Sequence, residues 1–425
     1  MQSTERPQIF KNTEISQISK RDAVKKLEHF LSAMPAGQLA PSAIRSQLTK
    51  IKESLYLSIL TKTMKNLYEQ ASQYKSWRFS KEGLLELRKN VNSKGIEAAK
   101  KSHAMEKQLK DELDGKMDVD STGPDGQKAN DNQNKNVISD SQFLTFEEEQ
   151  EYVSFYETKI RDFAKAFKLS QKVKATAVMY MKRFYLHNTV LDYQPKQILL
   201  VCLFLSAKAE NQFMSIEEFT KHQSKTSPAD IIDLELILCQ SLRFDLAVIH
   251  PYNAAYGYYL DLQEYVTDFQ LLTKAHLLAI SYIDTSLFTD VGLIFQPSQV
   301  AIACWKLATI KINNSSGPGS TSVALDFDGY LSKKISAKLL VNLYLIMDEI
   351  QQMITQYKAP SMETVKNIDR KLFYCKNPAK NSNSLLYKKL EEQKELAQKQ
   401  KKKKADKGKN DDNTMDHGSI DDVFS

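Results

Sequence analysis

An internal repeat constrains the fold of this 425-residue chain more than any other feature of its sequence. The segment YQPKQILLVCLFLSA (193–207) aligns with FQPSQVAIACWKLAT (295–309), and Gln, Pro, Gln and Cys recur at matching positions. In both copies the proline stands where a helix would begin, which is a favoured place for proline. Because repeated segments of this kind indicate repeated structural units, the sequence predicts an all-α fold that contains two copies of one helical unit.

The sequence of the first copy predicts five helices, one of which lies at the centre of the other four. Apolar residues recur at helical spacing in five segments, at about 147–167, 171–187, 196–209, 215–222 and 228–242. The third segment is apolar on nearly every side, which is typical of a helix buried from all directions. We therefore expect four helices around a central third. In the second copy we expect residues 313–330 to form a loop that replaces one helix.

Changes in composition along the chain predict its division into domains. Residues 114–142 are almost entirely polar, Gly or Pro, so they cannot bury a core and are expected to form a disordered linker. In the N-terminal extension we expect a helix at 42–72 and a second helix that Ser80 caps. The predicted parts are an N-terminal extension with helices (1–113), the disordered linker (114–142), the first repeat (143–248), the second repeat (249–358), and a C-terminal helix with a charged tail (359–425).

Composition and motifs argue against several classes of protein. The net charge of +7 is too small to require a nucleic-acid partner, and no long uninterrupted apolar stretch or signal pattern predicts a membrane segment. The four cysteines are far apart, so we expect a reducing compartment and no disulfide framework. No phosphate-binding, dinucleotide-binding, zinc-protease or hydrolase motif occurs, and the seven histidines are scattered. We expect no catalytic residues, no cofactor and no metal.

Two segments resemble the cyclin family, and within it cyclin H, the regulatory subunit of the TFIIH kinase module in transcription. The segment TAVMYMKRFYLHNTVLDYQPKQILLVCLFLSAK (176–208) is similar to the second and third helices of a cyclin box. The segment KSWRFSKEGLLELR (75–88) is similar to the N-terminal helix of cyclin H. The resemblance implies tandem five-helix cyclin boxes with flanking N- and C-terminal helices.

The same resemblance implies a function and a binding site. Lys208 and Glu235 stand where cyclins carry a Lys and a Glu that bind backbone groups of a kinase's αC helix. The chain would then be a non-enzymatic subunit that activates a cyclin-dependent kinase. That kinase would phosphorylate the C-terminal repeats of RNA polymerase II and, in many organisms, other cyclin-dependent kinases. The implied partners are this kinase, a RING-finger assembly subunit and the TFIIH core, in the nucleus, without direct nucleic-acid or membrane contact.

Two alternatives remain open at this point. Another transcriptional cyclin, of the C, K, L or T type, would share the fold and the Lys–Glu pair but bind a different kinase. A DNA-binding factor of the TFIIB type would share the fold, but that family carries an N-terminal zinc ribbon, and here no cysteine precedes Cys202. The first helix, YVSFYETKIRDFAKAF (152–167), also lacks the substrate-docking patch of cell-cycle cyclins. The basic run and acidic end of the tail are expected to be solvated, with nuclear import or phosphate contact as the alternative.

Overall fold

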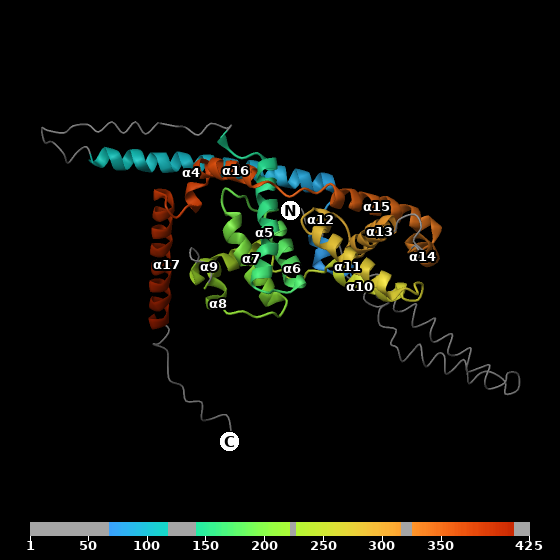
Figure 1. Cartoon of the computed structure of the whole chain (residues 1–425). Coiled ribbons are helices and arrows are strands. Elements are labelled where there is room, and N and C mark those ends of the chain that lie inside the picture. The colour runs from blue at the N-terminus through green and yellow to red at the C-terminus, as the bar shows by residue number, and fades with distance from the viewer. Residues whose placement is uncertain (1–67, 118–141, 222–226, 316–324, 412–425) are drawn as a thin grey trace, which may run out of the picture. The chain divides into compact units, whose positions relative to one another are not determined.

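The computed structural model describes residues 68–117, 142–221, 227–315 and 325–411, with α3 and the later helices in the compact unit Gln70–Ser425 (Figure 1). The helix expected at 42–72 lies almost wholly outside the described residues. All regular structure in the described ranges is helical, as the sequence predicted. Among these helices, none combines the length and the apolar composition that crossing a bilayer requires.

The first repeat contains the five helices that its hydrophobic spacing predicted. They are α5 (Phe146–Ala166), α6 (Gln171–Phe184), α7 (Pro195–Ala209), α8 (Ile216–Thr220) and α9 (Pro228–Ser241). Four of the five begin at a Ser or Thr whose side chain accepts a hydrogen bond from a backbone N–H of the first turn: Thr145, Ser170, Ser215 and Ser227. Such caps satisfy donors that have no partner within the helix, so they fix where each helix starts.

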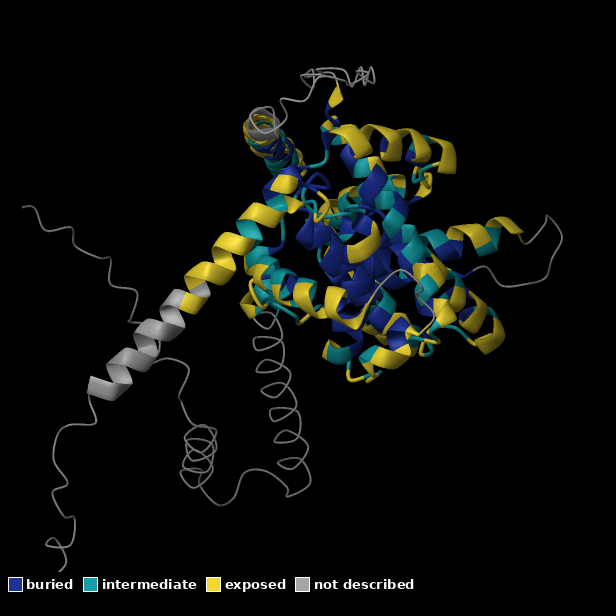
Figure 2. Ribbon diagram, turned by 90° about the vertical axis from the view of Figure 1, so that its left-hand side faces the viewer, coloured by how far each residue is buried: buried dark blue, intermediate teal, exposed yellow. Residues whose placement is uncertain are grey.

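Helix α7 is the buried centre of this repeat. Its apolar residues from Ile198 to Leu205 are all buried, and it packs against α5, α6 and α9. Figure 2 shows this concentration of buried residues inside the helical repeats. The prediction of a central third helix is therefore confirmed.

The second repeat has the same plan around a second central helix. It contains α10 (Pro251–Leu262), α11 (Phe269–Ser286), the short α12 (Val291–Ile294), α13 (Pro297–Ser315), α14 (Phe327–Lys334) and α15 (Ala337–Thr355). The central α13 packs against α10, α11 and α15. Its Trp305 is fully buried and donates a hydrogen bond from Nε1 to the carbonyl of Ala255 at 2.9 Å.

The prediction of a loop at 313–330 is wrong at both ends, because helices occupy the first and last residues of that range. Helix α13 continues to Ser315, and α14 begins at Phe327 after Asp326 caps it through the backbone N–H of Gly329. Helix α14 buries Phe327 and Leu331 although it has only eight residues. A helix this short carries too few apolar repeats to stand out beside a Gly- and Ser-rich segment. Residues 316–324 lie outside the described residues.

The helices that flank the repeats are α3 (Ser72–Ser76), α4 (Lys81–Met117), α16 (Met362–Cys375) and α17 (Leu385–Asp411), with a 3₁₀ turn at Pro378–Lys380. Ser80 accepts a hydrogen bond from the N–H of Gly83 at 3.0 Å, so it starts α4 as predicted. Helix α4 continues four residues into the predicted linker, whose remaining residues up to 141 lie outside the described ones. The proposed boundary at 248/249 falls in the connection between α9 and α10.

Helix α4 joins both repeats to each other. Arg88 binds Asp290, which lies between α11 and α12, through two hydrogen bonds of 2.7 Å. Asn92 donates at 2.7 Å to Glu149 of α5. Paired polar contacts of this kind fix orientation, because breaking one leaves a buried group without a partner.

Trp77, between α3 and α4, anchors the start of α4 against both repeats. We call α4, together with Trp77, the N-terminal clamp. Its ring is 1% exposed and packs with Met179 of α6 and Leu293 of α12. Its Nε1 donates to Asp245 at 3.1 Å, and the guanidinium of Arg183 lies 5.0 Å from the ring centroid. One side chain therefore touches both repeats.

We expect Trp77→Ala to lower the free energy of unfolding by about 3–5 kcal/mol, because a large side chain is removed from a fully packed site. Denaturant unfolding would measure the change. Leu113→Ala on α4 is the control, since Leu113 is exposed and its truncation leaves no cavity. A loss below about 1 kcal/mol for Trp77→Ala would show that α4 docks without this anchor.

His250 gives the fold a dependence on pH. It stands at the N-cap position of α10 without a capping side-chain hydrogen bond, and its Nε2 lies 2.7 Å from the hydroxyl of Thr176, which in turn donates to Glu210. Burial lowers the pKa of His250 to about 4, although the Glu210 carboxylate acts in the opposite direction. The folded pKa therefore lies below that of the unfolded chain, so His250 contributes stability at neutral pH that is lost as the pH falls.

We expect this loss to reach about 3 kcal/mol between about pH 6.5 and about pH 4. Unfolding of the wild type and of His250→Gln, compared across this range, isolates the contribution from that of other groups. The wild type should lose more stability than the variant. Parallel curves for the two proteins would contradict a buried, neutral histidine.

Candidate partner-binding site

Lys208 lies where the buried helix α7 reaches the surface. It occupies the last turn of that helix, where a cation is favoured by the exposed carbonyl groups. Its ammonium lies 4.7 Å from the ring centroid of Phe204, which holds the side chain against the protein. Because α7 is packed on all sides, the position of Lys208 is fixed by the core of the first repeat.

Glu235 is placed beside it by helix α9. Ser227 and Asp230 form a capping box that begins this helix, with hydrogen bonds of 3.2 and 2.8 Å. Ile231 and Leu238 are buried, so α9 packs against α7 along one side. Glu235 lies on the helix between these two anchors, at the edge of the contact.

The two predicted site residues form an ion pair with each other. Their side chains are 39% exposed for Lys208 and 18% exposed for Glu235, so both can be reached from solvent. The structure thus brings together two residues that lie on different helices and that the resemblance assigned to one surface. Their role in binding a partner stays a prediction.

Helix α9 and the segment after α7 also expose apolar residues. Phe213 follows α7 and is 79% exposed, and Ile232 and Leu236 lie exposed one turn apart on α9. Exposed large apolar side chains that gather near polar groups mark surfaces for protein partners. The sequence analysis did not assign these neighbours. The signal was present in α9, which is apolar on more sides than its buried face requires.

Phe244, in the turn after α9, is exposed from a strained backbone. Arg243 and Phe244 follow α9 with φ angles of 54° and 57°, a region that costs side-chain-bearing residues about 1–2 kcal/mol each. The guanidinium of Arg243 lies 5.7 Å from the ring centroid of Trp77, and the next residue, Asp245, accepts the Trp77 hydrogen bond. These contacts hold the turn, and the turn leaves the ring of Phe244 64% exposed.

No group of three or more His, Cys, Asp or Glu side chains is placed to hold a metal ion in the described residues. His187 is exposed, and its ring makes an edge-to-face contact with Trp77, with the centroids 5.8 Å apart.

Comparison with known proteins matches both repeats to described domains. The family model of the cyclin N-terminal domain matches residues 127–247, and that of the cyclin C-terminal domain matches residues 250–355. Cyclin-H1-1 of Arabidopsis thaliana is 29% identical over 321 residues, which are 72% of this chain and 88% of that protein. A cyclin-H-like protein of Dictyostelium discoideum is 31% identical over 254 residues, which are 56% of this chain and 75% of that protein.

A solved structure agrees with these sequence relatives. A chain of the CAK complex from Chaetomium thermophilum, solved with ATP-γ-S bound, superimposes with a TM-score of 0.56 at 26% identity. The match covers 78% of this chain and 94% of that chain. The similarity therefore extends beyond the two repeats into the flanking segments.

The Lys208–Glu235 pair should contribute little to stability, because both side chains are reached by solvent and exposed ion pairs are weak. We expect the double variant Lys208→Ala/Glu235→Ala to change the free energy of unfolding by less than about 1 kcal/mol. Denaturant unfolding at low and high salt would measure it. A loss of several kcal/mol would mean that the pair holds α7 and α9 together and is structural.

Proposed function

The chain belongs to the cyclin family, and we propose that it is the regulatory subunit that binds and activates a cyclin-dependent kinase of the TFIIH kinase module. The observation that carries this proposal is the Lys208–Glu235 pair at the solvent-exposed edge of α7 and α9. Support for the kinase partner comes from the cyclin-H relatives and from the CAK complex to which one similar chain belongs.

The chemistry of the pair suits recognition of a helix end. A Lys ammonium donates to carbonyl groups, and a carboxylate accepts from backbone N–H groups. Hydrogen bonds to charged groups are the stronger kind. In the free chain Lys208 and Glu235 satisfy each other, and a kinase αC helix would replace part of this mutual contact with its own backbone groups. Since the pair lies at the surface, that exchange costs little.

The exposed apolar residues would supply the hydrophobic part of the interface. Ile232 and Leu236 are exposed on α9, the helix that carries Glu235, and Phe213 and Phe244 are exposed in the segments that follow α7 and α9. Protein interfaces combine such apolar contacts with polar ones. The backbone of Phe244 is held in a strained turn before any partner binds. Binding therefore loses less backbone entropy at this residue.

Activation would follow from selective binding of one kinase state. Phosphoryl transfer in protein kinases needs the αC helix in place so that its Glu pairs with the β3 Lys. A subunit that binds only this state shifts the population toward it. Moving the ratio of active to inactive kinase from about 1:99 to about 99:1 requires about 5.5 kcal/mol of differential affinity. In this scheme the chain itself contributes no catalytic group.

The finer parts of the proposal concern partners and place. We propose that the activated kinase phosphorylates the C-terminal repeats of RNA polymerase II and can act on other cyclin-dependent kinases. A RING-finger assembly subunit and the TFIIH core would complete the assembly in the nucleus. The cyclin-H relatives and the CAK complex support this assignment over that of the other transcriptional cyclins.

The test compares kinase binding and kinase activity for the wild type and Lys208→Ala/Glu235→Ala, co-purified from their own cells. Hydrogen bonds to charged groups contribute about 1.5–3 kcal/mol each, so the affinity should fall by at least about tenfold. Phe244→Ala should also weaken binding. Activity is measured on a peptide of the polymerase C-terminal repeat.

A matched control is Lys159→Ala/Asp162→Ala, which removes an exposed ion pair from α5. It should bind and activate as the wild type does. Equal loss in both double variants would contradict the assignment of the site. Capture of a different cyclin-dependent kinase would keep the site and move the function to another transcriptional cyclin.

A further inference from the structure

The basic end of α17 concentrates positive charge in one short stretch of the chain. Between Lys399 and Lys409 there are seven lysines and one aspartate, and four of the lysines are consecutive, at 401–404. This stretch belongs to the last turns of α17, which ends at Asp411. A lysine run of this kind is typical of segments that bind a nuclear-import receptor or a nucleic acid.

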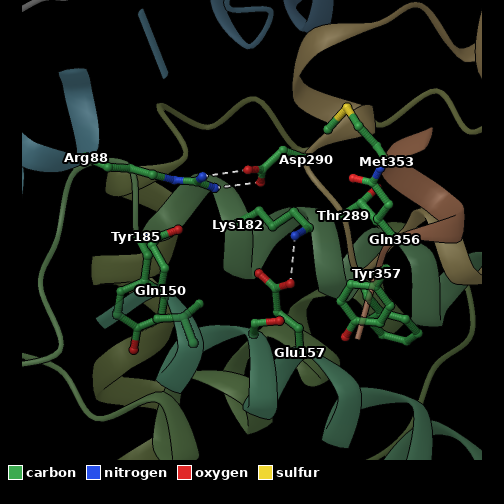
Figure 3. Close-up of a pocket in the computed structure, with 13 residues that line it drawn as sticks. Arg88, Gln150, Glu157, Lys182, Tyr185, Thr289, Asp290, Met353, Gln356 and Tyr357 are labelled. Atoms are coloured by element: carbon green, nitrogen blue, oxygen red, sulfur yellow. Dashed lines mark hydrogen bonds and ion pairs between the residues drawn. The ribbon is translucent and has the colours of Figure 1, made fainter. Parts of the chain in front are cut away.

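Charges inside the folded body, in contrast, neutralise one another. A cavity of about 350 Å³ lies between α4, α5, α6, the segment after α11 and the end of α15 (Figure 3). Within it Arg88 binds Asp290 and Lys182 binds Glu157, each at 2.7 Å. These pairs leave the cavity without net charge. Seven lysines beside one aspartate cannot be balanced in this way within the basic run.

The start of α17 is anchored to the rest of the structure. Glu106 of α4 accepts hydrogen bonds from the backbone N–H groups of Leu385 and Leu386, at 3.2 and 2.8 Å. Ser384 accepts from the N–H of Tyr387 at 3.0 Å, and Leu386 is buried. The helix packs against α4 and against the 3₁₀ turn that precedes it. These contacts fix the place at which α17 leaves the body.

Beyond this anchor the helix is open to solvent. Figure 1 shows α17 running away from α4. The side chains at 392–397 and that of Lys399 are all exposed, which covers every side of the helix. Glu395 pairs with Lys399, one turn further along the same helix, at 3.7 Å. A receptor can therefore approach this part of α17 without displacing another element.

The lysine run weakens the helix that contains it. Lys403 stands four residues after Lys399 and four before Lys407, and like charges at this spacing destabilise a helix. Gly408 lowers the helix propensity further. A helix without tertiary packing is marginally stable even with a favourable sequence. The run can therefore unwind at low cost when a partner binds it.

The consecutive spacing of the lysines favours recognition in an extended form. Successive residues of an α-helix lie about 100° apart around its axis, so a partner on one side contacts only part of a consecutive run. An extended segment presents successive residues along a line instead, where a groove can bind one after another.

The sequence around the run argues against a nucleic-acid backbone as its partner. After Lys409 the chain has five aspartates and no lysine or arginine, so negative charge that repels phosphate adjoins the run. Between Tyr387 and Phe424 it has no Phe, Tyr or Trp that could stack on bases. A protein groove that binds lysine side chains one at a time does not require a basic or aromatic surface around them.

We propose that residues 399–409 are a nuclear-import signal, which unwinds from α17 and binds a lysine-recognising import receptor in extended form. The lysine ammonium groups donate to carboxylate and carbonyl groups of that receptor. The contacts of Glu106 and Leu386 keep the start of α17 in place while its end unwinds. The signal rests on the nuclear location in the proposed function and is independent of the kinase-binding pair.

The test follows the full chain, joined to a fluorescent protein, in its own cells. In the test variant Gln replaces the four lysines at 401–404, because Gln removes the charge but keeps the helix propensity. In the matched control Gln replaces four exposed lysines scattered over α4 and α16: Lys94, Lys101, Lys107 and Lys366. The nuclear fluorescence of the test variant should fall toward that of the fluorescent protein alone, and the control should stay nuclear.

A binding measurement accompanies the imaging. Calorimetry compares the purified full chains for affinity to a purified import receptor of the class that binds lysine-rich signals. Because hydrogen bonds to charged groups are the stronger kind, the test variant should lose at least about tenfold in affinity. The imaging is repeated with Lys208→Ala/Glu235→Ala, so that a bound kinase cannot carry the chain into the nucleus.

Three outcomes would overturn the proposal, and they differ in what else they affect. If the test variant stays nuclear and binds the receptor as the wild type does, the run is not the signal and the kinase-binding function stands. If the wild type stays in the cytoplasm, the nuclear location in the proposed function fails as well. If the test variant keeps the receptor but loses binding to duplex DNA or RNA, the run contacts phosphate.

Discussion

The burial of helix α7 is the constraint on which the rest of the first repeat depends. Its residues from Ile198 to Leu205 are apolar on every side, so the chain reaches low free energy only when other helices surround α7 completely. That requirement places α5, α6 and α9. It also decides where α7 can reach solvent, at the turn that carries Lys208. The candidate site thus lies where the core of the first repeat reaches the surface.

Polar contacts then set how the repeats are joined. Hydrophobic burial has little directional preference, whereas the two hydrogen bonds between Arg88 and Asp290 allow one orientation of α4. The Lys182–Glu157 pair lies in the same cavity. Buried ion pairs add little net stability compared with apolar packing, but a mispaired arrangement would leave charges buried alone. These polar contacts therefore specify how α4 and the repeats are oriented.

The surface of the first repeat leaves large apolar side chains uncovered, whereas its interior is fully packed. Phe213 and Phe244 expose aromatic rings, and Phe244 does so from a left-handed backbone that Arg243 and Trp77 hold in place. Stability alone favours neither feature. Both are explained if a partner covers them, since an apolar surface and a prearranged turn lower the cost of association. Trp77 thereby links the N-terminal clamp to the candidate interface.

The sequence by itself determined the helical class, the repeat and the limits of the first five helices to within a few residues. Apolar spacing, Ser and Thr caps and Pro at helix starts are local signals, and here they agree with the tertiary packing. They failed at α14, because an eight-residue helix gives too short a pattern beside the Gly- and Ser-rich segment. Lys208 could be named from the sequence because it ends a segment that resembles a family, and Glu235 because it stands at the position where that family carries its Glu.

Tertiary structure alone decided which distant residues meet. Nothing in the local pattern of α4 relates Arg88 to Asp290, and nothing near Glu157 indicates that Lys182 of the next helix will be its partner. Asp245, next to the exposed Phe244, accepts a hydrogen bond from Trp77, which lies 168 residues away in the chain. Periodicity reports which face of a helix is buried, but the partner of that face is set by how all the helices pack at once. The cavity and the full extent of the candidate interface are properties of that packing.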